Sequence, residues 1–136
     1  MRSYIGGSFG EYKNISGKIE SFAKISLVDG LLDSSYKSTG STLIGFDGSI
    51  NSVLCDGENV FVGGLFQSYG GLFANSIAKF NMITWELDTT FNPPSSNGFD
   101  GTVMSLKING SHLYVGGFFS AYRGISNSAN GLAKLN

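Results

Sequence analysis

The chain has 136 residues and a mass of 14.4 kDa, which is the size of one ordinary domain. Hydrophobic residues make up 41% of it and charged residues only 14%, well below the quarter that is usual in soluble domains, so Ser, Thr, Asn and Gly must form much of the surface. The net charge of −1 comes without any long run of like charge, which excludes the basic footprint of a protein that binds nucleic acid or anionic lipid.

The N-terminal stretch MRSYIGG lacks the apolar core of a signal peptide, and no apolar run in the chain approaches the length of a membrane span. Met1 directly precedes strand-like sequence, from which we expect a segment taken from a longer chain. The phrase SYIGGSFGEYKN at 3–14 is followed by a polar, irregular stretch at 13–21, and then by FAKI at 22–25 and LLDSSY at 31–36.

The middle of the chain predicts four short β segments, at 50–55, 59–66, 76–81 and 84–91. Their apolar residues alternate or are β-branched and aromatic, and Gly, Asn, Asp and Ser separate them. The turn DGEN at 56–59 contains Asp-Gly and matches NGSH at 109–112, which contains Asn-Gly; both supply the positive φ of a tight hairpin. Four antiparallel strands joined by short turns describe one blade of a β-propeller.

The same phrases return along the chain at a nearly constant spacing. FAKI at 22–25 returns as IAKF at 77–80 and as LAKL at 132–135, at an offset of 55 each time. GFDGSINSVL at 45–54 returns as GFDGTVMSLK at 98–107, and the glycine phrase of 3–14 returns as VFVGGLFQSYGG and LYVGGFFSAYRG. Such internal repetition indicates a repeat architecture.

The three copies occupy residues 1–44 (partial), 45–97 (complete) and 98–136 (partial) of a single segment. We therefore predict an all-β chain of about 2.5 four-stranded antiparallel propeller blades. In each glycine pair, such as Gly63-Gly64, the missing side chains would let a neighbouring strand or blade approach, or permit a bulge. Phe61, Phe66 and Tyr69 would fill the space between blades.

Four phrases in register resemble the delta-60 repeat, a family of bacterial β-propeller repeats: YVGGxFxxYxG, LAKLN, LDTTF and GFDGxVxSL. The resemblance covers nearly the whole chain. It implies a propeller within a large extracellular or cell-surface protein of bacteria, and it implies no general catalytic residues. The first copy departs from the pattern, because Asn14 stands where Gly71 and Gly124 stand in the others.

The number of blades leaves the ring incomplete. Propellers close with about four to eight blades, and a lone wedge would expose apolar blade faces and unpaired strand edges. Two chains would supply about five blades and three chains about seven, so we expect a homo-oligomer with closed symmetry that completes the ring. Analogy with trimeric surface fibres favours the trimer over the dimer. The alternative is that the missing blades belong to a longer parent chain.

Residues suited to catalysis or metal binding are few. His112 is the only histidine and follows a predicted hairpin turn, so the parts of a Ser-His-Asp triad or a His-based metal site are lacking. We expect Asp47 and Asp100, each in Gly-Phe-Asp-Gly, to close turns on their own backbone. Cys55, in an apolar run, is predicted to be a small buried hydrophobe. We expect no catalytic residue, no metal and no cofactor.

A binding role has more residues to draw on. Four predicted loops combine Ser, Asn and Gly with aromatic residues, at 13–21, 68–76, 92–102 and 120–131. The candidate ligand-binding residues are Trp85, Arg123, Tyr122, Tyr69 and Tyr12. The three tyrosines recur at one repeat position, whereas Trp85 has Gly30 at the matching position of the first copy. The alternative is that these aromatic rings pack between blades.

These observations lead to two main hypotheses of function. The first is a non-catalytic recognition or adhesion module of a bacterial surface or fibre protein, binding a glycan or a surface protein, with an extracellular location implied by the resemblance alone. The second is a structural assembly or spacer domain of a fibre, in which the candidate side chains would be buried. A third, a hydrolase or lyase with a site in a shared central channel, would need acidic residues or His112 to converge there.

Overall fold

The computed structural model describes residues 2–12, 15–16, 21–33, 45–93, 98–126 and 128–136. Within these ranges the protein is all-β, built of small antiparallel sheets with no helix and no closed barrel. These ranges also contain no helix long and apolar enough to cross a lipid bilayer. The predicted all-β class is therefore confirmed.

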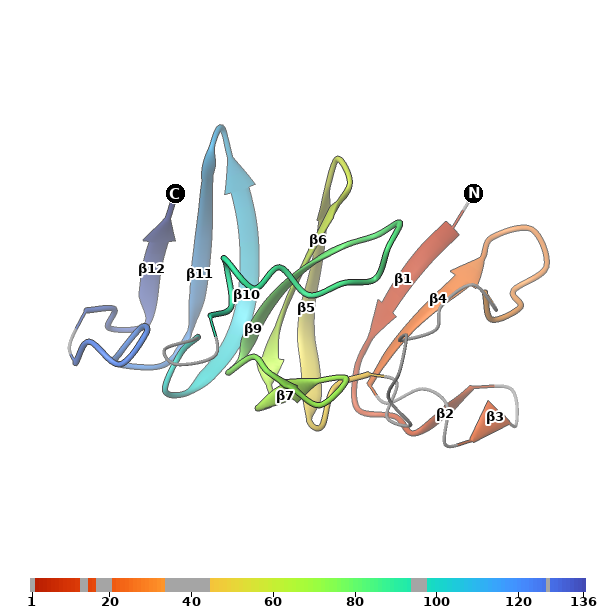
Figure 1. Cartoon of the computed structure of the whole chain (residues 1–136), viewed down its shortest axis with the longest axis horizontal. Helices are drawn as coiled ribbons and strands as arrows, with labels where there is room; N and C mark the ends of the chain where they lie inside the picture. The colour runs from red at the N-terminus through yellow and green to blue at the C-terminus, as the bar shows by residue number, and fades with distance from the viewer. Residues whose placement is uncertain (1, 13–14, 17–20, 34–44, 94–97, 127) are drawn as a thin grey trace.

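Three main sheets stand side by side in chain order (Figure 1). Sheet 1 pairs β1 (Arg2–Gly6) with β4 (Phe22–Ser26). Sheet 2 has the order β5 (Ser49–Asp56), β6 (Asn59–Leu65) and β9 (Ile77–Asn81). Sheet 3 has the order β10 (Thr102–Asn109), β11 (His112–Phe118) and β12 (Leu132–Leu135). Two short pairs lie in the loops: β2 (Glu11–Tyr12) with β3 (Ile15–Ser16), and β7 (Ser68–Tyr69) with β8 (Leu72–Phe73).

The predicted hairpin turns are confirmed in sheets 2 and 3. Asp56 lies opposite Asn59 across a two-residue loop that begins with Gly57 at a φ of +58°. Sheet 3 repeats this arrangement, with Gly110 at a φ of +60°. A glycine reaches this left-handed conformation without steric cost, which is why it stands at this place in both loops.

The glycine pair of sheet 2 serves both of the purposes that its sequence predicts. A Cβ on Gly64 would collide with the backbone of Ser49, where the register of β5 shifts between Ile50 and Ser52, so this glycine accommodates a bulge. A Cβ on Gly63 would collide with the side chain of Val103 in sheet 3. The first glycine therefore lets the next sheet approach closely.

The predicted strand at 84–91 does not form. The side-chain oxygen of Asn81 accepts hydrogen bonds from the N–H groups of Ile83 and Thr84, at 2.8 and 3.1 Å, and this ends the strand in a turn. The segment then touches β9 at a single bridge, between Leu87 and Phe80. Because Asn and Asp side chains offer the backbone such local partners, a run with strand-like composition is divided into turns.

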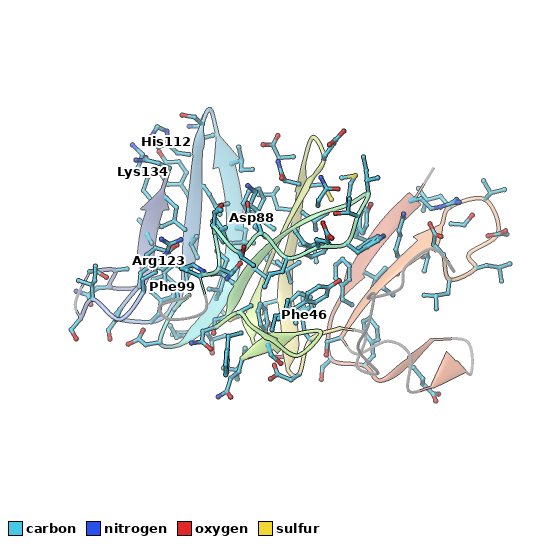
Figure 2. All side chains as sticks on the ribbon, viewed as in Figure 1. Phe46, Asp88, Phe99, His112, Arg123 and Lys134 are labelled. Carbon is cyan, nitrogen blue, oxygen red and sulfur yellow. The ribbon has the colours of Figure 1, made fainter. Side chains whose placement is uncertain are left out.

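Two apolar cores fill the spaces between the sheets. Core 1, between sheets 1 and 2, includes Phe22, Phe46 and Val62; core 2, between sheets 2 and 3, includes Phe99 and Val103. Phe46 packs against the rings of Phe66 and Tyr69, and Phe99 packs against those of the matching residues Phe119 and Tyr122. Figure 2 labels Phe46 and Phe99. The aromatic residues expected to fill such spaces do so, because Phe61, Phe66 and Tyr69 are all buried.

Cys55 is exposed, contrary to its prediction as a buried hydrophobe. It lies at the hairpin end of β5, one residue before the turn that begins at Asp56 and two before Gly57. Partial desolvation still raises the pKa of its thiol above the ordinary value. The apolar run SVLC thus extends past the edge of the core.

Candidate ligand-binding site

Two hollows lie at the end of the sheets opposite the hairpin turns, one at each junction between sheets. The hollow between sheets 2 and 3 has a volume of about 440 Å³ and is lined in part by Phe66, Ser76 and Asp100. The hollow between sheets 1 and 2 has a volume of about 450 Å³. We call them the C-hollow and the N-hollow, respectively.

The two hollows are built from equivalent residues of successive repeats. Ser76 and Phe99 line the C-hollow, and Ser21 and Phe46 line the N-hollow at the matching positions. Both serines have a left-handed backbone, with φ of +59° at Ser76 and +61° at Ser21. Such a conformation is uncommon in a residue with a side chain. Its recurrence shows that the same loop geometry shapes each hollow.

The recurring aspartates hold the loops that surround the hollows. Asp47 Oδ1 accepts hydrogen bonds from the N–H groups of Gln67 and Ser68 at 2.7 and 2.9 Å, and Oδ2 accepts one from the Ser68 hydroxyl at 3.0 Å. Asp100 does the same with Ser120 and Ala121, at 2.7 to 2.9 Å. Each carboxylate bonds its own backbone, as the predicted local turn requires, but its larger role is to fasten a loop about twenty residues further along the chain, which the sequence did not predict.

These hydrogen bonds lower the pKa of both carboxyl groups. Burial alone would raise the pKa of Asp47, but the bonds from the amides of Ser68 and Gln67 outweigh it, and the pKa lies below its ordinary value. The Ser120 hydroxyl and the amides of Ala121 and Ser120 lower the pKa of Asp100. Both groups are therefore carboxylates near neutral pH, with lone pairs left to accept further hydrogen bonds.

The C-hollow adds two carboxamide side chains to these carboxylates. Gln67 and Asn75 both line it and are exposed to solvent, whereas Phe66 and Phe99 are buried beneath. The hollow therefore offers amide donors and acceptors beside carboxylate acceptors, on an apolar support. This set suits a ligand rich in hydroxyl groups, each of which donates one hydrogen bond and accepts others.

Two of the predicted candidate residues lie in core 1. Tyr69 is 3% exposed and stacks on Phe80 at a centroid distance of 5.3 Å. Trp85 is 6% exposed and packs against Phe80, Tyr4 and Phe22 at centroid distances of 5.5 to 6.3 Å. Neither ring lines a hollow, and both take the packing role that was the alternative prediction.

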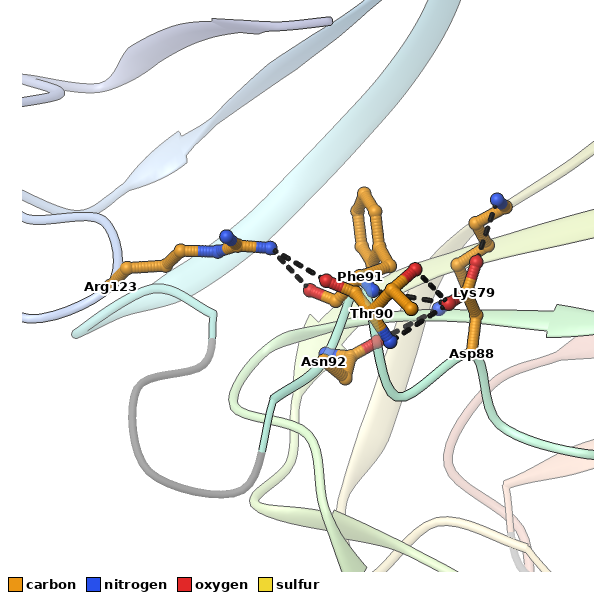
Figure 3. Close-up of polar contacts among 6 residues, drawn as sticks. All are labelled: Lys79, Asp88, Thr90, Phe91, Asn92 and Arg123. Atoms are coloured by element: carbon orange, nitrogen blue, oxygen red, sulfur yellow. Dashed lines mark hydrogen bonds and ion pairs between the residues drawn. The ribbon is translucent and has the colours of Figure 1, made fainter.

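Arg123 and Tyr122 lie in the loop between β11 and β12. Arg123 Nη2 donates a hydrogen bond of 2.7 Å to the carbonyl oxygen of Phe91 and a longer one, of 3.4 Å, to that of Thr90 (Figure 3). Its guanidinium lies 5.3 Å from the centre of the Tyr122 ring. Burial raises the pKa of Tyr122, although Arg123 opposes this. Arg123 thus ties two loops together.

Tyr12, the last candidate, pairs through its backbone with Ile15 in the β2–β3 pair, and its side chain lies outside the described residues. The residues that sequence reasoning missed are Gln67 and Asn75. The repeated GFDG phrase was the available signal, because Asp47 and Asp100 occupy the same place in the two copies and frame the loops that carry these amides.

Within the ranges that the structure describes, no three His, Cys, Asp or Glu side chains gather closely enough to hold a metal ion. Comparison with known proteins gives no matching family model, no matching curated protein and no matching solved structure.

Proposed function

We propose that the chain is a non-catalytic recognition module, a segment of an oligomeric β-propeller in a bacterial surface or fibre protein, and that its hollows bind a glycan. One observation carries the proposal: a polar hollow of the same construction recurs at both sheet junctions. Repeated weak sites suit adhesion, because several engaged at once bind far more tightly than one.

The propeller is supported by the way in which the sheets follow one another. The side chain of Ile50 in sheet 2 lies against Gly6 in sheet 1, and the side chain of Val103 in sheet 3 lies against Gly63 in sheet 2. The same contact between one sheet and the next is what a ring of repeated blades leads us to expect. On this proposal two or three chains complete the ring, with three favoured, and the hollows would then be distributed around it.

The choice of a glycan follows from the polar groups of the C-hollow. Two carboxylates and two carboxamides can satisfy the paired donor and acceptor needs of vicinal hydroxyl groups. The aromatic rings Phe66 and Phe99 are buried, so they support the loops and leave no face for stacking. We therefore expect modest affinity for a single site, with selectivity set by hydrogen bonds.

The experiment is a binding screen on immobilised glycans with the intact protein. Binding of any glycan found in the screen should be mostly lost in Gln67→Ala, since Gln67 lines the hollow and the hydrogen bonds that the described residues give it involve only its backbone N–H and C=O, which the substitution keeps. Asn109→Ala is the matched control, since Asn109 is an exposed residue at the hairpin end. Binding that is equally unaffected by both substitutions would contradict the proposed site.

The second candidate is a structural assembly or spacer domain of a fibre. The burial of Tyr69 and Trp85 favours it, because the most distinctive aromatic residues then serve packing. A protein that assembles into a ring of defined mass, but binds neither glycans nor surface proteins, would favour this function over recognition.

A further inference from the structure

Both hollows are lined by Asp47. It borders the N-hollow beside Phe46 and Gly48, and it also borders the C-hollow beside Gln67. The N–H of Gln67 donates a hydrogen bond of 2.7 Å to Asp47 Oδ1, and Asp47 is exposed to solvent. The two hollows therefore adjoin at an exposed carboxylate that belongs to both.

The two hollows also share one backbone frame. In the N-hollow the N–H of Ser21 donates a hydrogen bond of 2.8 Å to the carbonyl oxygen of Phe9. In the C-hollow the N–H of Ser76 donates one of 2.9 Å to the carbonyl oxygen of Phe66. A ligand group that fits against the backbone of one hollow therefore meets the same backbone in the other.

The side chains on this common frame differ. Gly10 takes the place of Gln67, and Ser8 takes that of Leu65. A Cβ on Gly10 would meet no described atom within 4 Å, so the N-hollow is open where the C-hollow carries a carboxamide. Leu65 is 56% exposed and gives the C-hollow an apolar wall. The C-hollow thus offers more side-chain contacts than the N-hollow.

The charge of the hollows narrows the class of glycan. Among the described residues that line them, the charged side chains are Asp47 and Asp100, and there is no lysine or arginine. Carboxylates repel a ligand that carries negative charge, whereas they accept hydrogen bonds from neutral hydroxyl groups. The hollows therefore disfavour sialic, uronic and sulfated sugars and favour neutral ones.

We propose that the two hollows are adjoining subsites of one groove, and that the glycan is an unbranched neutral chain that occupies both. This inference rests on the proposed function, because it deepens the role of the same hollows. The chain follows the row of sheets at the end opposite the β5–β6 and β10–β11 turns (Figure 1). It passes from one subsite to the next at Asp47, whose carboxylate accepts hydrogen bonds from hydroxyl groups on either side.

Two adjoining subsites make the affinity depend on the length of the chain. A monosaccharide fills one hollow, and the C-hollow holds it better because Gln67 and Asn75 supply carboxamides there. A longer chain that is held in the C-hollow reaches the N-hollow at a high effective concentration, so even a weak second subsite raises the total affinity.

The test titrates the intact protein with neutral unbranched oligosaccharides, from mono- to hexasaccharides of glucose, mannose, galactose and N-acetylglucosamine. In at least one series the affinity should rise about tenfold or more with chain length. Oligomers of galacturonic acid and of sialic acid should bind more weakly than the neutral chains. A protein that binds no glycan, either here or in the immobilised screen, contradicts the proposed function itself.

NMR of the isotope-labelled protein locates the two subsites. The hexasaccharide should shift the backbone amides of Gly10 and Ser21 together with that of Asn75, whereas the monosaccharide should mainly shift Asn75. Gly10→Gln places a carboxamide where the C-hollow has Gln67, and it should bind the hexasaccharide about two- to tenfold more tightly than Gly10→Ala does. Gly10→Ala is the matched control, because it makes the same backbone change without the amide.

Several results would overturn this inference while leaving glycan binding in place. An affinity that does not change with chain length would make each hollow a separate site. A hexasaccharide that shifts no amide of the N-hollow would have no second subsite, and equal affinities of Gly10→Gln and Gly10→Ala would mean the same. Acidic chains that bind as tightly as neutral ones would contradict the selection by charge.

Discussion

Gly63 lies directly against Val103 of the neighbouring sheet, so closely that a Cβ on the glycine would overlap the valine side chain. Gly6 bears the same relationship to Ile50, one repeat earlier. Within the described ranges, a Cβ on the corresponding glycine of sheet 3, Gly116, would meet only the carbonyl oxygen of Gly131, at 3.9 Å. The three glycines share one sequence context but differ in what faces them.

This difference predicts opposite outcomes for two identical substitutions. Gly63→Ala should lower the free energy of unfolding by about 1–3 kcal/mol, because the added methyl group forces sheets 2 and 3 apart. Gly116→Ala, its matched control, should change it by less than about 0.5 kcal/mol when both are measured at a dilution at which the chain is monomeric. Urea unfolding of both variants measures this. Equal losses would mean that Gly63 acts through backbone conformation and not through close approach.

The outward face of sheet 3 predicts self-association. Leu132 is 67% exposed there, whereas Ile77, at the matching position of sheet 2, is 0% exposed beneath sheet 3. Phe118 on the same sheet is 77% exposed. Apolar faces of this kind are usually covered in stable proteins. Light scattering across a dilution series should therefore give the mass of a closed oligomer, and the proposed ring favours three chains.

The matched pair for that measurement is Leu132→Lys and Ile83→Lys. Both residues are 67% exposed, but Ile83 lies in the turn after β9, away from the open face. Only Leu132→Lys should shift the mass toward the monomer. A wild-type protein that stays monomeric and well folded at every concentration would contradict the shared ring.

The buried side-chain amide of Asn92 should contribute strongly to the free energy of unfolding. Asn92→Ala leaves the N–H of Lys79 and the carbonyl oxygen of Ile77 without the partners that the side chain supplies. The free energy of unfolding should fall by about 1–3 kcal/mol. Asn109→Ala, at an exposed hairpin position, should be neutral within about 0.5 kcal/mol. A neutral Asn92→Ala would show that water replaces the amide at the edge of β9.

The lowered pKa of the Asp88 carboxyl group should make the protein less stable in acid. Burial opposes ionisation of Asp88, but the hydrogen bonds from Lys79, Thr90 and Phe91 outweigh it, and the pKa of the carboxyl group lies well below its ordinary value. A carboxyl group with a lowered pKa in the folded state stabilises the protein above the unfolded pKa of about 4. That contribution disappears as the pH falls through the folded pKa.

The corresponding measurement compares the free energy of unfolding at about pH 5 and about pH 3. In the wild type it should be lower at the more acidic pH, and Asp88→Asn should reduce the difference, because its amide cannot titrate. Lys79→Gln should reduce it as well, since Lys79 is a principal partner of the carboxylate. A difference unchanged in both variants would assign the acid sensitivity to other carboxyl groups.

Much of the fold followed from local sequence signals. The repeats, the Asp-Gly and Asn-Gly turns and the glycine pairs each depend on residues close together in the chain, and the structure has them where they were predicted. The strand predicted at 84–91 does not form, because composition does not reveal that the Asn81 side chain will accept a hydrogen bond from the backbone N–H of Ile83. The prediction that Cys55 is buried was wrong because the apolar pattern of a strand does not show which of its residues extend beyond the core.

The candidate site was harder to predict because its contacts join distant parts of the chain. Asp47 holds a loop that begins about twenty residues later, and no spacing rule links the two. Aromatic residues stood out in the sequence, yet Tyr69 and Trp85 proved to be packing residues. Gln67 and Asn75 carry no signal of their own, since exposed amides are common in any polar loop.

The strand β6 has a further consequence for how the protein unfolds. Its successive residues alternate between the two cores, with Val60 and Val62 in core 1 and Phe61 in core 2. A strand without a solvent face cannot slip by one residue without exchanging the contents of both cores. Separating sheet 2 from either neighbouring sheet also exposes one face of β6 to solvent. We therefore expect sheet 2 to be the last element to exchange its amide protons with solvent, and sheets 1 and 3 to open before it.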